Sequence, residues 1–447
     1  MTRGSLLLGL DVGTSRIKAV LVGDDGSERA CSAVATPFRT TDAGTEAPVA
    51  ELVAAVGRAL GELGDDRRRV AALGIAGVAE SGAPFDGRGR PLAPVIAWHD
   101  RRGDEVATAL EERFGIELAR CIGQTVRPVS SVAKLGWLLD QGVGGVARWL
   151  GVPELVLHAL TGSEVTEWSL AARTGCFDVG RREWMPEVAG VAGVDVSVFP
   201  APEAAGVTMG QVTEEGAAWS GLTPGIPVTV AGHDHLAGLV GSGAAPDDLA
   251  NSVGTAETVV GRSAGLPDID AALAAGVAVT VFPGGDGWAA LASGARAGLA
   301  LDDAAAQLGS SPAELDALAA TSGTEVLDPS SLVDDLRRRE SPRLPEGEPG
   351  TVWRTLLDAL AVCTGEAVDK VTGLLGPAPR LVVFGGGSRS APWLAAKAAR
   401  LELPVWRTTA GEAVARGAAV FAGVSAGWWR SPAEAPAPPL EAVQARE

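Results

Sequence analysis

The chain has 447 residues, 46% of them apolar, which gives room for two large domains and argues against a disordered protein. Its formal net charge of −18 argues against a nucleic-acid partner, because contacts to nucleic-acid phosphates need clustered Lys and Arg. The simplest interpretation of the charge is a solvated acidic surface.

Cysteine usage and hydropathy indicate the cellular compartment. Cys31, Cys121, Cys176 and Cys363 form no CxxC pair, which argues against a zinc site or a disulfide framework and favours reduced thiols. The first apolar run stops at Asp11, too early for a signal peptide, and no stretch approaches the roughly 20 apolar residues of a membrane span. We therefore expect a soluble cytoplasmic protein without a membrane partner.

The first predicted elements form a β-hairpin. Apolar residues 6–10 lead into Asp11-Val12-Gly13-Thr14-Ser15, and residues 17–22 follow as a second strand. In the rest of this half, helical spacing and apolar runs predict helices over residues 49–63, 104–120 and 131–139, and strands over residues 70–75 and 228–231.

The C-terminal half opens on a second hairpin, which contains Ser252-Val253-Gly254-Thr255-Ala256. A buried strand over residues 381–384 runs into three glycines, Gly385 to Gly387. Helices are predicted over residues 351–375 and 412–418. The charged, proline-containing residues 325–350 predict a surface loop.

The two Val-Gly-Thr turns indicate an internal repeat. A repeat half a chain apart predicts two similar domains that face each other across a cleft. Glycines and a proline within residues 236–246 are expected to loosen the chain between them. The predicted division is residues 1–240, residues 241–428 and a flexible tail over residues 429–447.

Each Val-Gly-Thr turn has the chemistry of a phosphate-binding loop. Gly13 and Gly254 let the backbone approach a phosphate closely, while Thr14, Ser15 and Thr255 offer hydroxyl and N–H groups. Asp11, at the strand end, is a candidate Mg²⁺ ligand, directly or through water. The alternative is an ordinary hairpin turn, because Asp, Gly and Thr favour turns. Two such loops are what a triphosphate held from both sides requires.

A third candidate loop contains Gly385, Gly386 and Ser388. Glycines between a strand and a helix allow a flat ligand to approach the backbone. A dinucleotide-binding fold is the competing interpretation, but the GxGxxG spacing is absent from the sequence. A flexible loop without a ligand remains the other alternative.

Asp234 ends a strand beside the predicted boundary. A carboxylate there can accept a proton from a substrate hydroxyl. Asp is also a favoured helix N-cap, and both roles are compatible. His233 and His235 suggest a metal site, but neighbouring side chains on a strand point in different directions, so joint ligation is not expected.

Two acidic residues and a tryptophan suggest a carbohydrate site. Trp98-His99-Asp100-Arg101-Arg102 combines a ring that covers C–H surface with an acid that accepts from hydroxyls. Glu80 follows a strand among small residues and is also placed to face the cleft. The alternative is a surface Asp–Arg pair with a packing tryptophan.

Taken in order, these motifs resemble the FGGY carbohydrate kinase family of the actin-like ATPase superfamily. The resemblance covers residues 6–428 and rests on an ordered set rather than on any single motif. The set comprises DxGT at 11–14, GxPLxPxIxWxDxR at 89–102, RTGxFD at 173–178, GxPVTVAGxD at 225–234, the second GT hairpin, GGGS at 385–388 and EAxAxGAA at 412–419.

The resemblance implies an α/β fold of two ribonuclease H-like domains across a catalytic cleft, with sugar binding and catalysis in the first domain and nucleotide binding in the second. It implies phosphorylation of a hydroxyl of a small sugar or polyol, with ATP and Mg²⁺, and allows a homodimer. The implied roles are Asp234 as catalytic base, also touching substrate; Asp11 at the metal; Gly13, Thr14, Ser15, Gly254 and Thr255 at the phosphates; Gly385, Gly386 and Ser388 near adenosine; and Glu80, Trp98 and Asp100 at the sugar.

Two alternatives stay open. A catalytically weakened regulator of the same fold would bind sugar or nucleotide without turnover, and another ATPase of the superfamily would not need a sugar base. The substrate loop, residues 77–80, lacks the sequence typical of xylulose or glycerol kinases. The acceptor is therefore left undetermined.

Overall fold

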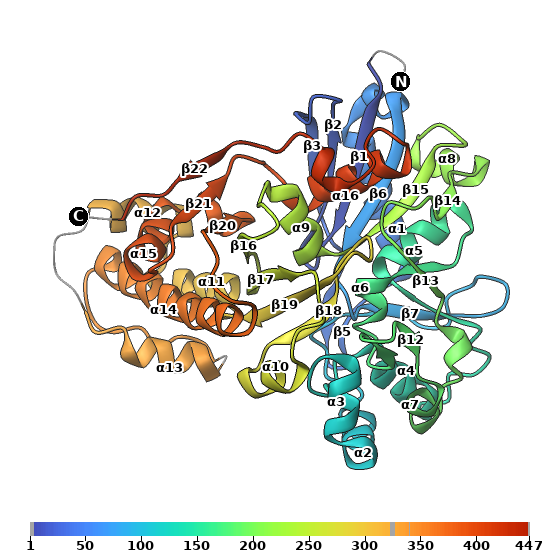
Figure 1. The fold of residues 1–447 in the computed structure, drawn as a ribbon, viewed down its shortest axis with the longest axis horizontal. Helices are drawn as coiled ribbons and strands as arrows, with labels where there is room; N and C mark the ends of the chain where they lie inside the picture. The colour runs from blue at the N-terminus through green and yellow to red at the C-terminus, as the bar shows by residue number, and fades with distance from the viewer. Residues whose placement is uncertain (1–3, 322–326, 339, 446–447) are drawn as a thin grey trace.

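The computed structural model describes residues 4–321, 327–338 and 340–445. Two large β-sheets, one formed mainly by each half of the chain, organise it, with helices between and around them (Figure 1). Their strands are largely buried and apolar, as expected for sheets covered on both faces.

The first sheet has the strand order β14-β15-β6-β1-β2-β3. Strands β1, β2 and β3 form an antiparallel meander, and β6 and β15 continue the sheet parallel to β1. The strands are β1 (Leu6–Val12), β2 (Arg16–Val22), β3 (Glu28–Ala35), β6 (Val70–Gly77), β14 (Gly210–Gln211) and β15 (Pro227–His233).

The second sheet follows the same path. Its order is β18-β19-β17-β16-β20-β21-β22, with β16, β17 and β19 antiparallel and β20 and β21 parallel to β16. The strands are β16 (Leu249–Val253), β17 (Glu257–Ser263), β18 (Ala278–Val281), β19 (Trp288–Ser293), β20 (Leu381–Phe384), β21 (Val405–Thr408) and β22 (Leu440–Ala442). The β1–β2–β3–β6–β15 pattern therefore recurs as β16–β17–β19–β20–β21, which confirms the predicted repeat.

Helices α9 (Asp234–Ser242) and α16 (Ala413–Ser425) lie between the two sheets (Figure 1). They approach so closely that a Cβ on Gly241 would overlap the Ala413 carbonyl, and one on Gly417 would overlap that of Ala237. The prediction that residues 236–246 loosen the chain is wrong for residues 236–242, because these glycines permit tight helix packing. Helix α16 also covers β1 and β6 of the first sheet.

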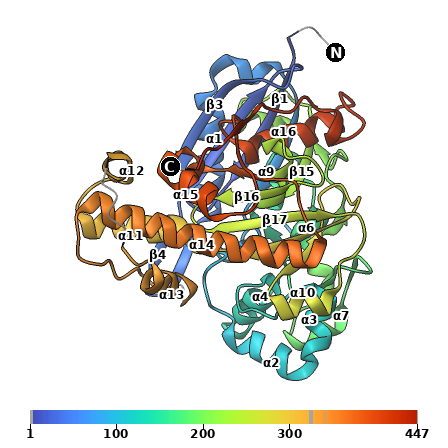
Figure 2. The same cartoon turned by 60° about the vertical axis from the view of Figure 1, so that its left-hand side comes forward.

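Longer helices cover the outer faces. Helices α1 (Val49–Glu62) and α5 (Val152–Thr161) pack against the first sheet, and α14 (Pro349–Leu375) packs against the second. Figure 2 shows α14 running across the front of the C-terminal lobe, with α13 (Ser330–Arg338) beneath it. The remaining C-terminal helices are α10 (Ile269–Ala275), α11 (Ala297–Leu308), α12 (Pro312–Thr321) and α15 (Ala391–Arg400).

A smaller sheet of order β4-β5-β8-β7-β9 lies below the first sheet with a group of short helices (Figure 1). The elements are β4 (Arg39–Thr41), β5 (Gly44–Ala47), β7 (Gly82–Phe85), β8 (Val95–Ile96), β9 (Arg148–Gly151), α2 (Asp104–Phe114), α3 (Ile116–Ile122), α4 (Ser131–Asp140) and α7 (Pro186–Val191). Gly115 divides the helix predicted over residues 104–120, because it adopts a positive φ of 53°.

Two irregular segments are more ordered than predicted. The expected loop over residues 325–350 contains α13 (Ser330–Arg338), whose Leu332 and Leu336 are buried beside α14; residues 325, 326 and 339 lie outside the described part. The tail predicted as flexible supplies β22, which pairs with β21 as an edge strand. Within the described residues, no helix is both long and apolar enough to cross a bilayer.

Candidate active site

A cavity of about 630 Å³ lies where the strand ends of the two large sheets meet. It brings together most of the residues that the sequence predicted. The lining includes Asp11, Gly13, Thr14, Ser15, Glu80, Trp98, Asp234, Gly254, Thr255, Gly385 and Gly386. Asp100 and Ser388 do not line it.

The two Val-Gly-Thr hairpins face each other across this cavity. The Gly13 N–H donates to the Arg16 carbonyl at 3.1 Å, and the Gly254 N–H donates to the Ala256 carbonyl at 3.1 Å. The hydroxyl oxygens of Ser15 and Thr255 are 3.4 Å apart. The two turns thus touch each other directly, and residues of both line the same cavity.

Asp234 is the first residue of α9, immediately after β15 ends. Its Oδ1 accepts the His235 backbone N–H at 2.7 Å, and the His233 ring nitrogen Nε2 lies 3.2 Å from the same oxygen. Its Oδ2 has no protein partner among the described residues, and the side chain lines the cavity. One oxygen is therefore held in place while the other stays free to accept a proton.

A buried network fixes the bend that presents Asp234. Gly232 has φ of 91°, and a Cβ there would overlap the carboxylate of Glu167 and the hydroxyl of Ser169. The Ser169 hydroxyl donates to Glu167 and accepts the His233 backbone N–H at 3.0 Å. Burial raises the pKa of Glu167 to about 8.

The two histidines beside Asp234 converge, contrary to the expectation from strand alternation. Potential ligand atoms of His233, Asp234 and His235 lie within 4.8 Å of one another, because the chain turns from strand into helix here. His235 Nδ1 lies 2.9 Å from the Ser252 hydroxyl, which links α9 to the second sheet. Burial lowers the pKa of His233 well below its usual range, so its ring is neutral.

Asp11 has the properties of a cation ligand. Its side chain is buried, and its Oδ1 has no hydrogen-bond partner in the described structure. Burial raises the pKa of Asp11 to about 7, against the attraction of Lys18 and with the repulsion of Asp234 and Glu412. Lys18 itself pairs with Glu412 at 2.6 Å. An orphaned buried carboxylate beside the Val-Gly-Thr turn fits Mg²⁺.

The Gly385 loop also lines the cavity. Gly385 has φ of 97°, and a Cβ there would lie 2.5 Å from the Val253 carbonyl, so only glycine fits. The Ser388 hydroxyl donates to the Gly385 carbonyl at 2.7 Å. Ser388 is therefore a support for the loop in this structure and does not reach the cavity.

Glu80 adopts a left-handed conformation with φ of 65°, which is unusual for a residue other than glycine. Its Oε1 accepts hydrogen bonds from Arg127 at 2.9 Å and from Arg173 at 2.8 Å, and its carbonyl accepts from Lys134 Nζ at 2.8 Å. Burial opposes ionisation, but the attraction of Arg173, Arg127 and Lys134 prevails and lowers the pKa of Glu80. Tertiary contacts thus hold the Glu80 carboxylate at the cavity although the Glu80 backbone is strained.

Trp98 and Asp100 have separate roles although they lie two residues apart. The Trp98 indole N–H donates to Thr14 Oγ1 at 2.9 Å, joining the segment after β8 to the first hairpin. Asp100 is buried, accepts the Thr45 N–H at 2.7 Å and pairs with Arg102 at 2.9 Å. The structure thus supports the alternative of an Asp–Arg pair for Asp100, and it does not bring this carboxylate to the cavity.

Among the cavity residues that the sequence did not predict are three polar ones beside Glu80. Gln124 and Arg127 come from the segment after α3, and Arg173 follows α6 (Trp168–Ala171). Arg173 lies within the RTGxFD motif, which was the only feature of the sequence that could have indicated a role for one of these residues in the site. The contacts of Arg127 and Arg173 with Glu80 span 47 and 93 positions, and no local pattern predicts them.

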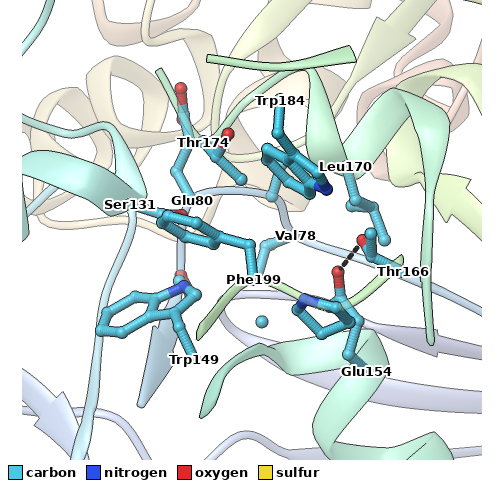
Figure 3. Close-up of a pocket in the computed structure, with 14 residues that line it drawn as sticks. Val78, Glu80, Ser131, Trp149, Glu154, Thr166, Leu170, Thr174, Trp184 and Phe199 are labelled. Atoms are coloured by element: carbon cyan, nitrogen blue, oxygen red, sulfur yellow. Dashed lines mark hydrogen bonds between the residues drawn. The ribbon is translucent and has the colours of Figure 1, made fainter. Parts of the chain in front are cut away.

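A second, small cavity of about 20 Å³ lies behind the Glu80 loop (Figure 3). Trp149, Trp184 and Phe199 surround it, and the Thr166 hydroxyl donates to Glu154 at 2.5 Å at its edge. Glu154 Oε2 and Trp184 Nε1 are buried without a partner in the described chain. The volume suits one water molecule, which would satisfy such groups.

The repeated sheets with a shared cavity define a two-domain protein of the actin-like ATPase fold. The model for the N-terminal domain of the FGGY family of carbohydrate kinases matches residues 6–241, and that for the C-terminal domain matches residues 333–426. The chain therefore belongs to the FGGY family of carbohydrate kinases.

Individual relatives are more distant. L-fuculokinase of Escherichia coli K12 is 32% identical over 187 residues, which is 41% of this chain and 40% of the relative. Xylulose kinase of Streptomyces rubiginosus is 28% identical over 415 residues, 87% of this chain and 82% of the relative. The crystal structure of xylulose kinase from Rhodospirillum rubrum has a TM-score of 0.81 at 24% identity, covering 99% of this chain and 94% of that one.

Proposed function

We propose that the protein transfers the γ-phosphoryl group of ATP to a hydroxyl of a small sugar or polyol. The observation that carries this proposal is the position of Asp234. Asp234 lines the cavity to which both hairpins contribute, at the N-terminus of α9, and its Oδ2 has no partner in the described structure. A base placed beside two opposed phosphate loops suits attack by an alcohol on a terminal phosphate.

The chain's own groups divide the work. Backbone N–H groups and hydroxyls of the two hairpins, including Thr14 and Thr255, bind the phosphates from opposite sides. The N-terminus of α9 adds a partial positive charge near the transferred group. Asp234 orients the acceptor hydroxyl and takes its proton as the new P–O bond forms.

Asp11 would hold Mg²⁺, directly or through water, because its buried Oδ1 is otherwise unpaired. When bound, the ion would supply charge neutralisation to the phosphates. The Gly385 and Gly386 backbone lines the opposite end of the cavity and leaves space for a flat base. Glu80 and Trp98 line the acceptor side.

The relatives' names do not decide the acceptor. Curated relatives are named L-fuculokinase, gluconokinase, xylulose kinase and glycerol kinase, and their acceptors differ in length, charge and oxidation state. These enzymes share one fold, which supports phosphoryl transfer as the reaction. The choice of acceptor must then depend on the residues around Glu80.

Coupled ADP-release assays over ketoses, aldoses, polyols and sugar acids would test the proposal. We expect turnover with at least one acceptor, and a fall in kcat of about 10²–10⁴-fold for Asp234→Asn. Asp247→Asn is the matched control, because Asp247 is exposed and does not line the cavity. Acceptor-independent ATP hydrolysis that is indifferent to Asp234 would refute the proposal, and tight acceptor binding without turnover would favour a regulator.

A further inference from the structure

The acceptor side of the cavity carries a cluster of positive charge that the proposed reaction does not use. We call Gln124, Arg127 and Arg173 the arginine corner; all three line the cavity beside Glu80. The Gln124 side-chain oxygen accepts from Arg127 at 3.0 Å and from Arg173 at 2.7 Å. Gln124 thus holds both guanidinium groups side by side against Glu80.

The two arginines differ in what they leave free. Arg173 is 10% exposed, donates from Nη1 to Gln124 and from Nη2 to Glu80, and leaves only its buried Nε without a partner in the described structure. Arg127 is 36% exposed and donates hydrogen bonds only from Nη2, to Glu80 and Gln124. Nε and Nη1 of Arg127 have no partner among the described residues, so this guanidinium retains donors for a ligand in the cavity.

Charge is unbalanced in the corner. The two guanidinium groups face one carboxylate, Glu80, and Lys134 lies buried behind it with its amine on the Glu80 carbonyl. Asp234 attracts Arg173 from a distance, but forms no ion pair with it in the described structure and is needed at the acceptor hydroxyl. A neutral acceptor would cover this corner and leave at least one guanidinium group without a counter-ion, which is costly.

We propose that the acceptor is a sugar acid, a polyhydroxylated carboxylate whose carboxylate group binds Arg127. The inference rests on the proposed kinase function and narrows it. Glu80 Oε2, which has no partner in the described part of the chain, accepts from a neighbouring hydroxyl of the same molecule. Charge-assisted hydrogen bonds of this kind are roughly twice as strong as neutral ones.

The reaction is a simple transfer. A hydroxyl oxygen of the sugar acid forms a bond to the γ-phosphorus while the bond from that phosphorus to the ADP oxygen breaks. The hydroxyl proton passes to Asp234, and the carboxylate takes no part in the chemistry. The products are a phosphorylated sugar acid and ADP.

Matched pairs of acceptors provide the test. D-gluconate is compared with D-glucitol, D-xylonate with xylitol and D-glucuronate with D-glucose, by ADP release and by calorimetric binding with a non-hydrolysable ATP analogue present. We expect kcat/KM to favour the acid by at least about tenfold in one or more pairs, since one charge-assisted bond contributes that much. An arm with D-xylulose 5-phosphate and D-glucose 6-phosphate separates carboxylate from phosphate recognition.

Arg127→Met should raise KM for the preferred acid about 10–100-fold, with a smaller change in kcat, and should abolish the preference within each pair. Arg68→Met is the control, because Arg68 is 72% exposed on the outer surface, and it should behave as wild type. Arg127→Lys should recover part of the affinity by keeping the charge.

The outcomes separate the two proposals. Turnover of neutral acceptors with no preference for acids, or a preference for the phosphorylated sugars, overturns the inference and leaves the kinase function standing. Arg127-dependent binding of acids without ADP release refutes the kinase function and supports the corner as a carboxylate site. Absence of acid binding in the calorimeter overturns the inference whatever the turnover assays show.

Discussion

Ser15 and Thr255 lie 240 positions apart in the chain, yet both line the cavity and their hydroxyl oxygens are 3.4 Å apart, within hydrogen-bond distance. Each belongs to a turn between the first two strands of its sheet. The relationship follows from the repeat, because two copies of one hairpin face each other about the shared helices. Phosphates bound between the turns would contact both lobes, so ligand binding and lobe arrangement are coupled.

Thr255→Val tests this relationship. The change removes one hydroxyl and keeps the side-chain volume, so we expect KM for ATP to rise about tenfold or more, as loss of a hydrogen bond to a charged group would cause. Unfolding temperature should hardly change, because the Thr255 side chain is partly exposed. Thr108→Val, on the exposed surface of α2, is the control. An unchanged KM for ATP would show that the hydroxyl does not contact phosphate.

Asp11→Asn tests the metal assignment without relying on activity. A cation that binds only the folded protein raises the unfolding temperature by mass action. We expect millimolar Mg²⁺ to raise the unfolding temperature of the wild type in the presence of ADP and to have a much smaller effect on the variant. Asp86→Asn, on an exposed turn, should respond as wild type does. Equal Mg²⁺ shifts for Asp11→Asn and wild type would contradict the assignment.

Much of the fold was predictable because its strands are continuous apolar runs. Residues 381–384 form β20 as predicted, and the Val-Gly-Thr turns identified both hairpins. Helix α13 was missed because charged residues and a nearby proline dominate its segment, and its buried face combines the apolar Leu332, Val333 and Leu336 with the acidic Asp335. Strand β22 depends on its pairing with β21, a contact that composition cannot reveal.

In the candidate site, too, local features were predictable from the sequence and long-range contacts were not. Residues within one turn, such as Asp11 and Gly13, were predictable because a short stretch of sequence determines both the turn and the polar groups that it presents. Arg127 and Arg173 were not, because only the folded chain brings them to Glu80. Asp100 was assigned to the sugar, but Arg102 and the Thr45 N–H satisfy its carboxylate first.

Glu167→Gln should change how stability depends on pH. Burial raises the pKa of Glu167 to about 8, so the folded protein keeps a proton that the unfolded chain releases above about 4.5. The wild type therefore loses stability as pH rises from about 4.5 to 8, and the variant does not incur this loss. We expect the variant to gain up to about 4 kcal/mol relative to wild type between pH 5 and pH 8.

Urea unfolding of both proteins at pH 5 and pH 8 measures this difference. Glu183→Gln is the control, because Glu183 is exposed, and it should follow wild type at both pH values. Parallel pH profiles of wild type and Glu167→Gln would show that the Glu167 carboxyl is ionised in the folded protein.

Gly417→Val should destabilise the contact between α9 and α16. A Cβ at this position overlaps the Ala237 carbonyl, so the helices must separate, and we expect a loss of about 3 kcal/mol or more. The matched control is Gly373→Ala in α14, where no atom lies within 4 Å of the added Cβ. That change should be neutral or stabilising by up to about 1 kcal/mol. Equal stabilities of the two variants in urea unfolding would contradict the close packing.

Lys397→Met tests a buried clamp on the second hairpin. Lys397 of α15 pairs with Glu257, donates to Asn251 Oδ1 at 2.6 Å and donates to the Thr364 hydroxyl at 3.0 Å. Asn251 precedes the second Val-Gly-Thr turn and Glu257 follows it, so the ammonium group ties the two ends of this turn together. Removing the charge leaves Glu257 buried and unpaired, which should cost about 3–5 kcal/mol.

A double variant separates the effect of Lys397 on stability from its effect on the position of the turn. Lys397→Met combined with Glu257→Gln leaves no unpaired buried charge, so we expect it to recover at least half of the lost stability in urea unfolding. KM for ATP should stay raised in both variants, because neither restores the tie between the two ends of the turn. Lys370→Met, exposed on α14, should leave both quantities unchanged. Wild-type KM in the double variant would show that the clamp stabilises the lobe without positioning the turn.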